Sequence, residues 1–218
     1  MSFNLSKGAT FNLSKSAPGL TRAGVGLGWV ANESPEGPIF DLDVSAFLLS
    51  SENRIEHPFN FVYYGSENKT KYGDENEERP YSLDASVLGA IDELEGGGDD
   101  GDDDGDEEDM RIFFENVDPA VQEIAVTVTI TKYPNDEKKD PRTLDLNFGQ
   151  VEGCYIRVWN EETNEEILRY DLNDKFGEQD AVEIGRFVRV DGDWVFKAIG
   201  SAHLGTLNYF IGQYASHL

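Results

Sequence analysis

The residues most able to do chemistry are carboxylates, and they gather in two places. Residues 96–109 read GGGDDGDDDGDEED, so every position there is glycine or an acid. Asp41 and Asp43 lie two residues apart in a second group, FDLDVSAFLL at 40–49. Glycine lets a backbone bend around an ion, and carboxylates supply the oxygens that Ca²⁺ binds at about 2.3–2.6 Å. Both groups therefore indicate a site for a hard cation.

The acidic tract matches only the first half of an EF-hand loop. Residues 100–105 fit D-x-D-x-D-G, but the twelfth position falls on Arg111, where an EF-hand has a bidentate Glu. Taken alone, the tract is explained equally well as a solvated, disordered polyanion. If it binds calcium, its missing ligands must come from elsewhere, and Asp41 and Asp43 are the candidates.

Other site chemistry has less support in the sequence. His57, His203, His217 and Cys154 lack the spacing of a zinc site. Mg²⁺ takes fewer protein ligands and more water than Ca²⁺, so an oxygen-rich loop favours calcium. No GxSxG, HExxH or GxxxxGK[ST] motif occurs, so we expect a protein that is not an enzyme.

Charge and composition restrict the partners. The 218 residues include 18 basic and 43 acidic ones, which gives a net charge of −25. Such a surface repels nucleic acid and anionic membranes and suits cations or basic partners. No apolar run approaches the roughly 20 residues of a membrane span, and no signal peptide is visible. With one cysteine and hence no internal disulfide, we expect a cytoplasmic protein.

A strand over residues 40–48 must position the aspartate pair. Its even-numbered positions are all apolar, whereas Asp41, Asp43 and Ser45 share the other face. Carboxylates at i and i+2 are about 6.5–7 Å apart at the backbone, close enough for their side chains to converge on one cation. An ordinary solvated face is the alternative.

The rest of the chain predicts many short strands and little helix. The near repeat FNLSKGA at 3–9 and FNLSKSA at 11–17 predicts a small hairpin or paired edge strands. Residues 83–95 suggest a short helix or an irregular segment. In 24–29 a strand with Val25 and Leu27 inward is a better interpretation than a phosphate loop, because no helix follows. Further strands are predicted at 59–64, 110–114, 123–131, 155–159, 167–170, 182–190 and 194–199.

The spacing of apolar residues after position 202 predicts a C-terminal helix over about 202–216. The predicted fold is thus all-β, an antiparallel β-sandwich with a long acidic loop and a short C-terminal helix. We expect one domain over residues 1–218.

Several segments together resemble the TerD family of tellurium-resistance and stress proteins. They are LSKGATFNLSKSAPGLTRAGVGLGW (5–29), FDLDVSAFLL (40–49), NFGQVEGCYIRVWNEETNEEILRYDL (147–172) and GDWVFKAIG (192–200). The resemblance implies a calcium-binding β-sandwich in a bacterial cytoplasmic stress protein. It also makes other stress or tellurium-resistance proteins candidate partners.

The family's motifs can be transferred residue by residue. Asp41 and Asp43 match its DLD motif, and its acidic loop, near GDN-x-x-G-x-G-D-G-D-D-E, matches parts of 92–108. Extra Gly and Asp residues between the two halves leave the register ambiguous by several positions. The implied ligands of one or two Ca²⁺ ions are Asp41, Asp43, Asp92, Asp99, Asp102, Asp104, Asp106 and Glu108.

Two other functions stay open at this point. The protein is alternatively an acidic interaction scaffold whose tract recruits basic partners. It is alternatively a small-molecule or cyclic-nucleotide module, since one relative is described as a cyclic-AMP-binding protein of a slime mould. That module needs a basic phosphate contact, and Arg22, Arg157, Arg169 and Arg186 form no cluster in sequence.

Overall fold

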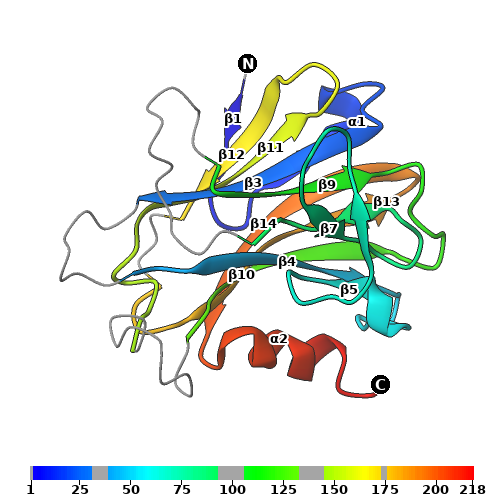
Figure 1. Ribbon diagram of the computed structural model, residues 1–218. Coiled ribbons are helices and arrows are strands. Elements are labelled where there is room, and N and C mark those ends of the chain that lie inside the picture. Colours follow the sequence, from blue (N-terminus) through cyan, green and yellow to red (C-terminus); the bar gives the residue numbers. More distant parts are fainter. Residues whose placement is uncertain (1, 31–38, 93–105, 133–144, 173–175) are drawn as a thin grey trace.

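The structure is a computed structural model that describes residues 2–30, 39–92, 106–132, 145–172 and 176–218. Over these residues the strands form two six-stranded sheets and a separate two-stranded hairpin (Figure 1). The sheets are mostly antiparallel and pack face to face, with a short helix near the C-terminus. The predicted all-β sandwich with a C-terminal helix is confirmed.

The first sheet has the order β1-β12-β11-β3-β9-β8. All its neighbours are antiparallel except β1 and β12, which run parallel. Its strands are β1 (Phe3–Asn4), β12 (Glu166–Asp171), β11 (Glu152–Asn160), β3 (Arg22–Val30), β9 (Glu108–Phe113) and β8 (Val87–Leu88).

The second sheet has the order β2-β14-β13-β10-β4-β5, with antiparallel neighbours throughout. Its strands are β2 (Thr10–Asn12), β14 (Asp193–His203), β13 (Ala181–Val190), β10 (Glu123–Ile130), β4 (Leu42–Leu49) and β5 (Phe61–Val62). The remaining elements are the hairpin β6 (Lys69–Lys71) and β7 (Glu78–Pro80), and the helices α1 (Leu13–Ser16), η1 (Pro58–Asn60) and α2 (Thr206–Tyr214).

The main core lies between the two sheets and is built from alternating residues of each strand. Val25 and Leu27 of β3 are fully buried there, as predicted, and so are Leu42 and Leu48 of β4. Because side chains alternate across a strand, β4 turns its odd-numbered residues to the opposite face of the second sheet.

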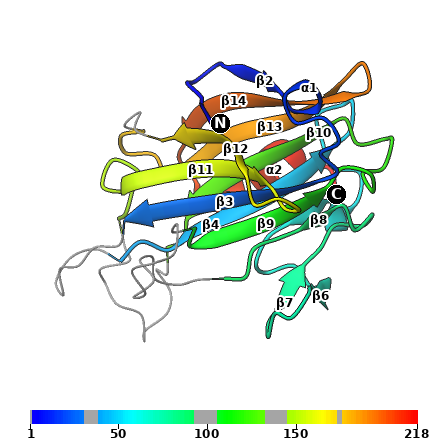
Figure 2. The same ribbon diagram turned by 90° about the horizontal axis from the view of Figure 1, so that it is seen from above.

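That opposite face of the second sheet is also buried. Helix α2 covers it (Figure 1), and Phe210 and Tyr214 of the helix form a second apolar cluster with Phe47 and Leu49 of β4. Viewed from above, α2 lies behind the sheets, while β12, β11, β3 and β9 of the first sheet face the reader (Figure 2). The face of β4 that carries Asp43 is therefore buried, and the alternative interpretation of this strand, an ordinary solvated face, does not hold.

The two copies of the N-terminal repeat do not form a hairpin with each other, so that part of the prediction was wrong, but each copy contributes an edge strand. Its first copy contributes β1, which pairs with β12 in the first sheet, and its second copy contributes β2, which pairs with β14 in the second sheet. Gly8 lies between β1 and β2, near the end of the first copy, with φ of 83°, and donates its N–H to the Ala198 carbonyl. The chain thus crosses from one sheet to the other, and the Phe3 and Phe11 rings of the two copies lie 4.8 Å apart.

One other prediction needs correction. The strand expected at 59–64 is reduced to Phe61–Val62, because Pro58 begins a short 3₁₀ turn, in which His57 Nδ1 accepts the N–H of Phe59. For residues 83–95 the sequence left a short helix or an irregular segment open; over 83–92 the structure has turns and β8 and no helix. Two prolines and dense charge in 132–146 predict a surface loop, but most of these residues lie outside the described ranges.

The other predicted strands are confirmed, and β13 and β14 form an antiparallel hairpin. Asp191 and Gly192 form its turn with φ of 52° and 89°, the backbone that an Asp-Gly pair favours. The C-terminal helix begins at Thr206, later than predicted, because β14 continues to His203. Across the described ranges, no helix combines the length and apolar character needed to cross a membrane.

Candidate metal site

Three of the predicted ligands come together at the start of β4. Asp43 lies in the strand and Asp41 just before it, where the Asp41 carbonyl still pairs with the Thr131 N–H of the chain after β10. One carboxylate oxygen each from Asp41, Asp43 and Asp92 lies within 4.8 Å of the others. Oxygens bound to one Ca²⁺ at about 2.4 Å can be up to twice that distance apart, so the group is spaced to share one ion.

The electrostatics of Asp43 favour a bound cation. Its side chain is 1% exposed, and the Thr131 hydroxyl donates a hydrogen bond to its Oδ2. Burial, and then the neighbouring charge of Asp41, raises the pKa of Asp43 to about 8. Among the described residues, its buried Oδ1 has no hydrogen-bond partner. An ionised carboxylate is costly in such a place unless a positive charge accompanies it.

The site opens to solvent on one side. Asp41 is 1% exposed, like Asp43, whereas Asp92 is exposed. Two of the candidate ligands thus lie in and just before a buried strand, and the third lies in the exposed segment that precedes the acidic tract. This arrangement offers a hard cation an entry path and an all-oxygen donor set, which suits Ca²⁺ better than Zn²⁺.

Two polar neighbours of the site were missed from sequence. Thr131 donates a hydrogen bond to Asp43, and Tyr64 lies near both, since its pKa is raised by its burial and then by the charge of Asp43. Thr131 is near the site because Thr129 pairs with Asp43 across β10 and β4. Only the register of these two strands would have revealed it, and register is not visible in local alternation.

A pair of buried hydroxyls continues the polar band along β4. Ser45 and Thr127 are cross-strand partners, and both are fully buried. Within the described part of the chain, neither Oγ of Ser45 nor Oγ1 of Thr127 has a hydrogen-bond partner. The oxygen-lined region therefore extends from the aspartates into the sheet.

Glu108 lies outside the group of three and has a structural contact of its own. It begins β9 in the first sheet, is 2% exposed, and accepts the N–H of Val44 through Oε2 at 2.7 Å. The two sheets are thus joined by a buried charged hydrogen bond next to Asp43. Its role as a metal ligand stays a prediction.

Asp106 lies apart from the aspartate group. Its Oδ2 is 2.7 Å from Arg157 Nε, and its Oδ1 is 3.1 Å from the Tyr155 hydroxyl. Because of the hydrogen bond from Arg157, the carboxylate of Asp106 already has a cationic partner. Burial raises the pKa of Asp106 more than Arg157 lowers it. The role of Asp106 as a metal ligand also stays a prediction. Asp99, Asp102 and Asp104 are outside the described residues.

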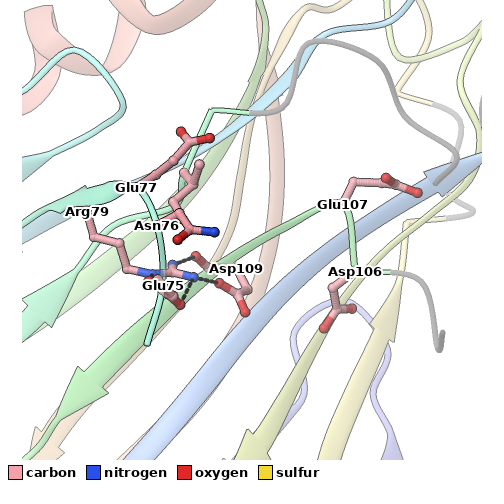
Figure 3. A pocket seen from close by; sticks show the side chains of 8 residues that line it. Glu75, Asn76, Glu77, Arg79, Asp106, Glu107 and Asp109 are labelled. Carbon is pink, nitrogen blue, oxygen red and sulfur yellow. Dashed lines mark hydrogen bonds and ion pairs between the residues drawn. The ribbon is translucent and has the colours of Figure 1, made fainter. Parts of the chain in front are cut away.

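A hollow of about 340 Å³ lies beside Asp106 and Glu107, and Figure 3 shows the side chains that line it. Arg79 reaches across it and forms ion pairs with Glu75 at 2.6 Å and with Asp109 at 2.7 Å. Most acids of this hollow are thus already paired with arginine, unlike Asp43.

Three of the four arginines considered for phosphate binding are also engaged. Arg157 pairs with Asp106, Arg169 pairs with Asp171 at 2.8 Å, and Arg186 pairs with Glu123 and Glu183. Arg157 and Arg169 are cross-strand neighbours, a closeness that the sequence did not reveal. The fourth, Arg22, lies over the Phe113 ring, with its guanidinium carbon 5.6 Å from the ring centroid. Since the other three guanidinium groups already have carboxylate partners, this geometry does not favour a phosphate site.

Comparison with known proteins supports the family resemblance. The TerD domain model matches residues 1–214. The tellurium resistance protein TerD of Serratia marcescens is 36% identical over 214 residues, which cover 98% of this chain and 97% of that protein. General stress protein 16U of Bacillus subtilis is 35% identical over 207 residues, which cover 95% and 94%.

A solved structure has the same fold. It is a homologue of telluride resistance protein (TerD) from Streptomyces coelicolor A3(2), with a TM-score of 0.55 and 19% identity. The match covers 88% of this chain and 95% of that one. At this identity the likeness concerns the arrangement of the sheets alone.

Proposed function

Because this chain belongs to the TerD domain family, we propose that it is a non-enzymatic, calcium-binding stress-response protein of the tellurium-resistance type. The names of its relatives, general stress protein and tellurium resistance protein, support the stress role. The single cysteine, Cys154, is free and buried, which suits a reducing cytoplasm.

The unpartnered, buried Oδ1 of Asp43 carries the proposal for calcium. Asp41 stands beside it, so the two charges repel each other in a place that water reaches poorly. A divalent cation held by Asp41, Asp43 and Asp92 would replace this repulsion by attraction. Acids of the tract, among them Asp99, Asp102 and Asp104, would add further oxygens toward the six to eight that Ca²⁺ takes.

Calcium would act on this chain mainly through stability. If it binds only the folded state, a concentration of 100 times the dissociation constant adds about 2.7 kcal/mol to the free energy of unfolding. The ion would also fix Asp92, and with it the start of the acidic tract, against the end of β4. Calcium would thereby change the surface that the protein presents at this end of β4.

Calorimetric titration of the full chain with CaCl₂, alongside thermal melts in calcium and in EDTA, tests the proposal. Asp43→Asn and Asp41→Asn should abolish or strongly weaken binding and the rise in melting temperature. Asp74→Asn, at an exposed aspartate elsewhere, is the matched control and should bind as the parent does. A parent protein whose midpoint does not move in millimolar calcium would overturn the proposal.

A variant of the acidic tract, compared with Asp41→Asn, separates calcium binding from the scaffold alternative. Replacing the five aspartates of 99–104 by asparagine removes charge from the tract and leaves the cluster at β4 intact. Weakened calcium affinity in this variant and in Asp41→Asn would support a shared site. Unchanged affinity in both would favour a tract that acts only as a polyanion.

A further inference from the structure

A second hollow lies at the other end of β4 from Asp43. It has a volume of about 390 Å³, within the range of small-molecule sites. Leu48, one of its lining residues, is the last but one residue of β4, at the end of the strand that pairs with β5 (Figure 1). The hollow is thus separated from the aspartate cluster by the length of the strand, and the two can be tested independently.

The base of this hollow is apolar and its rim carries one uncovered leucine. Leu48 and Val121 are 0% and 3% exposed and form part of the main core. Leu83 stands at the rim and is 53% exposed. A large apolar side chain beside an apolar base offers a small ligand surface to cover, at roughly 25 cal/mol for each Å² removed from water.

Two carboxylates at the rim have fixed positions and no cationic partner. Asp84 accepts hydrogen bonds from the Ser82 hydroxyl, the Ser86 N–H and hydroxyl, and the Asp118 N–H, at 2.6–3.0 Å. Asp118 accepts the Ala120 N–H through Oδ1 at 2.7 Å. All these donors are neutral, and over the described ranges neither aspartate forms an ion pair.

The environment keeps Asp84 ionised. Burial alone would raise the pKa of Asp84, but the hydrogen bonds from Asp118, Ser86 and Ser82 lower it below its usual range overall. Three other polar groups of the lining are engaged within the protein, among them the Ser50 hydroxyl, which donates to Glu56 Oε1. Glu56 is paired with Arg54, and His57 Nδ1 accepts the Phe59 N–H, which places the ring proton on Nε2.

Charge distinguishes this hollow from the one beside Asp106. There, Arg79 and Arg157 already pair with three of the five lining carboxylates, those of Glu75, Asp109 and Asp106. Here, the negative charge of Asp84 and Asp118 is balanced by no side chain of the described residues, next to an apolar base. A ligand that complements both features must combine a positive charge with an apolar body.

We propose that this hollow binds a small organic cation, whose protonated amine contacts Asp84 and Asp118 and whose apolar body covers Leu83 and the base. The proposal goes beyond calcium binding and does not depend on it. The hydrogen-bond donors around Asp84 orient the carboxylate before the ligand arrives, which lowers the entropic cost of binding.

Saturation-transfer NMR and calorimetry on the full chain test the proposal with three probes. The probe 2-phenylethylammonium has the charge and the apolar body, 3-phenylpropanoate reverses the charge, and ethylammonium lacks the ring. For a ligand of this size we expect a dissociation constant of about 1 mM for the first probe. The other two should bind at least about tenfold more weakly.

Two variants locate the site. Asp118→Asn keeps the acceptor for the Ala120 N–H but removes the charge, and Leu83→Ala removes exposed apolar surface. Each should weaken binding of 2-phenylethylammonium by about threefold to tenfold. Their controls, Asp74→Asn and Leu204→Ala, change an exposed aspartate and a 64% exposed leucine elsewhere and should bind as the parent does.

Thermal melts of all four variants establish that they are folded before binding is compared. The proposal is overturned by a parent chain that does not bind 2-phenylethylammonium at 10 times the expected constant, or that binds 3-phenylpropanoate equally well. It is also overturned if Asp118→Asn and Leu83→Ala bind as tightly as their controls. Calcium titrations of the same variants should be unchanged, because the aspartate cluster is intact.

Discussion

The carboxylate of Asp106 lies against the backbone of Gly26, in space that no other residue type would leave free. A Cβ added at Gly26 would be 2.0 Å from Asp106 Oδ2 and 2.2 Å from its Cγ. The other glycines of GVGLG serve the same purpose, since Gly24 lies under Trp159 and Gly28 under Tyr155. The glycine-rich stretch of β3 is therefore a packing surface for large and charged side chains of its neighbours.

Gly26→Ala should displace the Asp106 carboxylate from Arg157 and Tyr155. Loss of this charged hydrogen bond should lower the free energy of unfolding by about 1.5–3 kcal/mol, measured by urea denaturation. Gly212→Ala is the control, because nothing lies within 4 Å of an added Cβ there; in helix α2 it should be neutral or stabilise by up to about 1 kcal/mol.

A double variant tests whether Asp106 is the cause. In an Asp106→Ala background, Gly26→Ala should cost much less, since the two residues act through one contact. Equal costs in both backgrounds would contradict this account.

Glu108→Ala should destabilise the protein even in EDTA. The Val44 N–H would lose its buried acceptor, which costs about 1–3 kcal/mol, and Glu108→Gln should recover most of this because an amide oxygen can replace the carboxylate. Chemical denaturation in EDTA measures both. Asp41→Asn serves as the comparison, since it should not lower stability without calcium. A Glu108→Ala protein as stable as the parent in EDTA would exclude the structural role.

Tyr214→Phe should loosen helix α2 from the second sheet. The Tyr214 hydroxyl donates to Glu183 Oε2 and accepts from Arg186 Nη2, both at 2.8 Å, in a buried network. Its removal should cost about 1–3 kcal/mol and speed amide exchange over Thr206–Tyr214. Tyr209→Phe, for which no hydroxyl hydrogen bond is found among the described residues, should leave exchange unchanged. Slow exchange in Tyr214→Phe would show that apolar packing alone holds the helix.

Asp180 should make stability depend on pH in the acid range. Burial would raise its pKa, but Lys132 and the N–H groups of Thr206 and Gly205 lower it more, so the net shift is downward. A lowered folded-state pKa stabilises the protein above the unfolded-state pKa near 3.8, and this contribution is lost as pH falls through the folded-state value.

Asp180→Asn should therefore cost about 1–2 kcal/mol at pH 7 and progressively less below pH 4, as measured by denaturation at several pH values. The control is Asp191→Asn in the β13–β14 turn, where asparagine suits the positive φ. A cost for Asp180→Asn that does not change with pH would contradict the assignment.

Much of the fold could be predicted because strand alternation is a local signal. Val25 and Leu27, or the even-numbered residues of β4, point inward wherever the strand is placed. The partner of each strand could not be predicted in this way. Identical FNLSK segments join different sheets, and their positions depend on β12 and β14, which lie far away in the sequence.

The residues of the candidate site likewise fall into two groups, those that the local sequence could predict and those that only strand pairing brings to the site. Asp41 and Asp43 could be predicted because they share one strand face, and Asp92 through the family resemblance. Thr131 and Tyr64 reach the site through the pairing of β4 with β10 and the fold of the β5 segment, which no spacing reveals. Asp106 looked equivalent to its acidic neighbours, but its environment on β3 and β11 gives it an arginine partner.

The division of the N-terminal repeat between the sheets has a consequence for solubility. β1 covers the outer edge of β12, and β2 covers the outer edge of β14. Without these two short strands, each sheet would present a row of unpaired N–H and C=O groups to other molecules, the template on which proteins aggregate. One short segment thus protects both open edges on this side of the sandwich from intermolecular strand pairing.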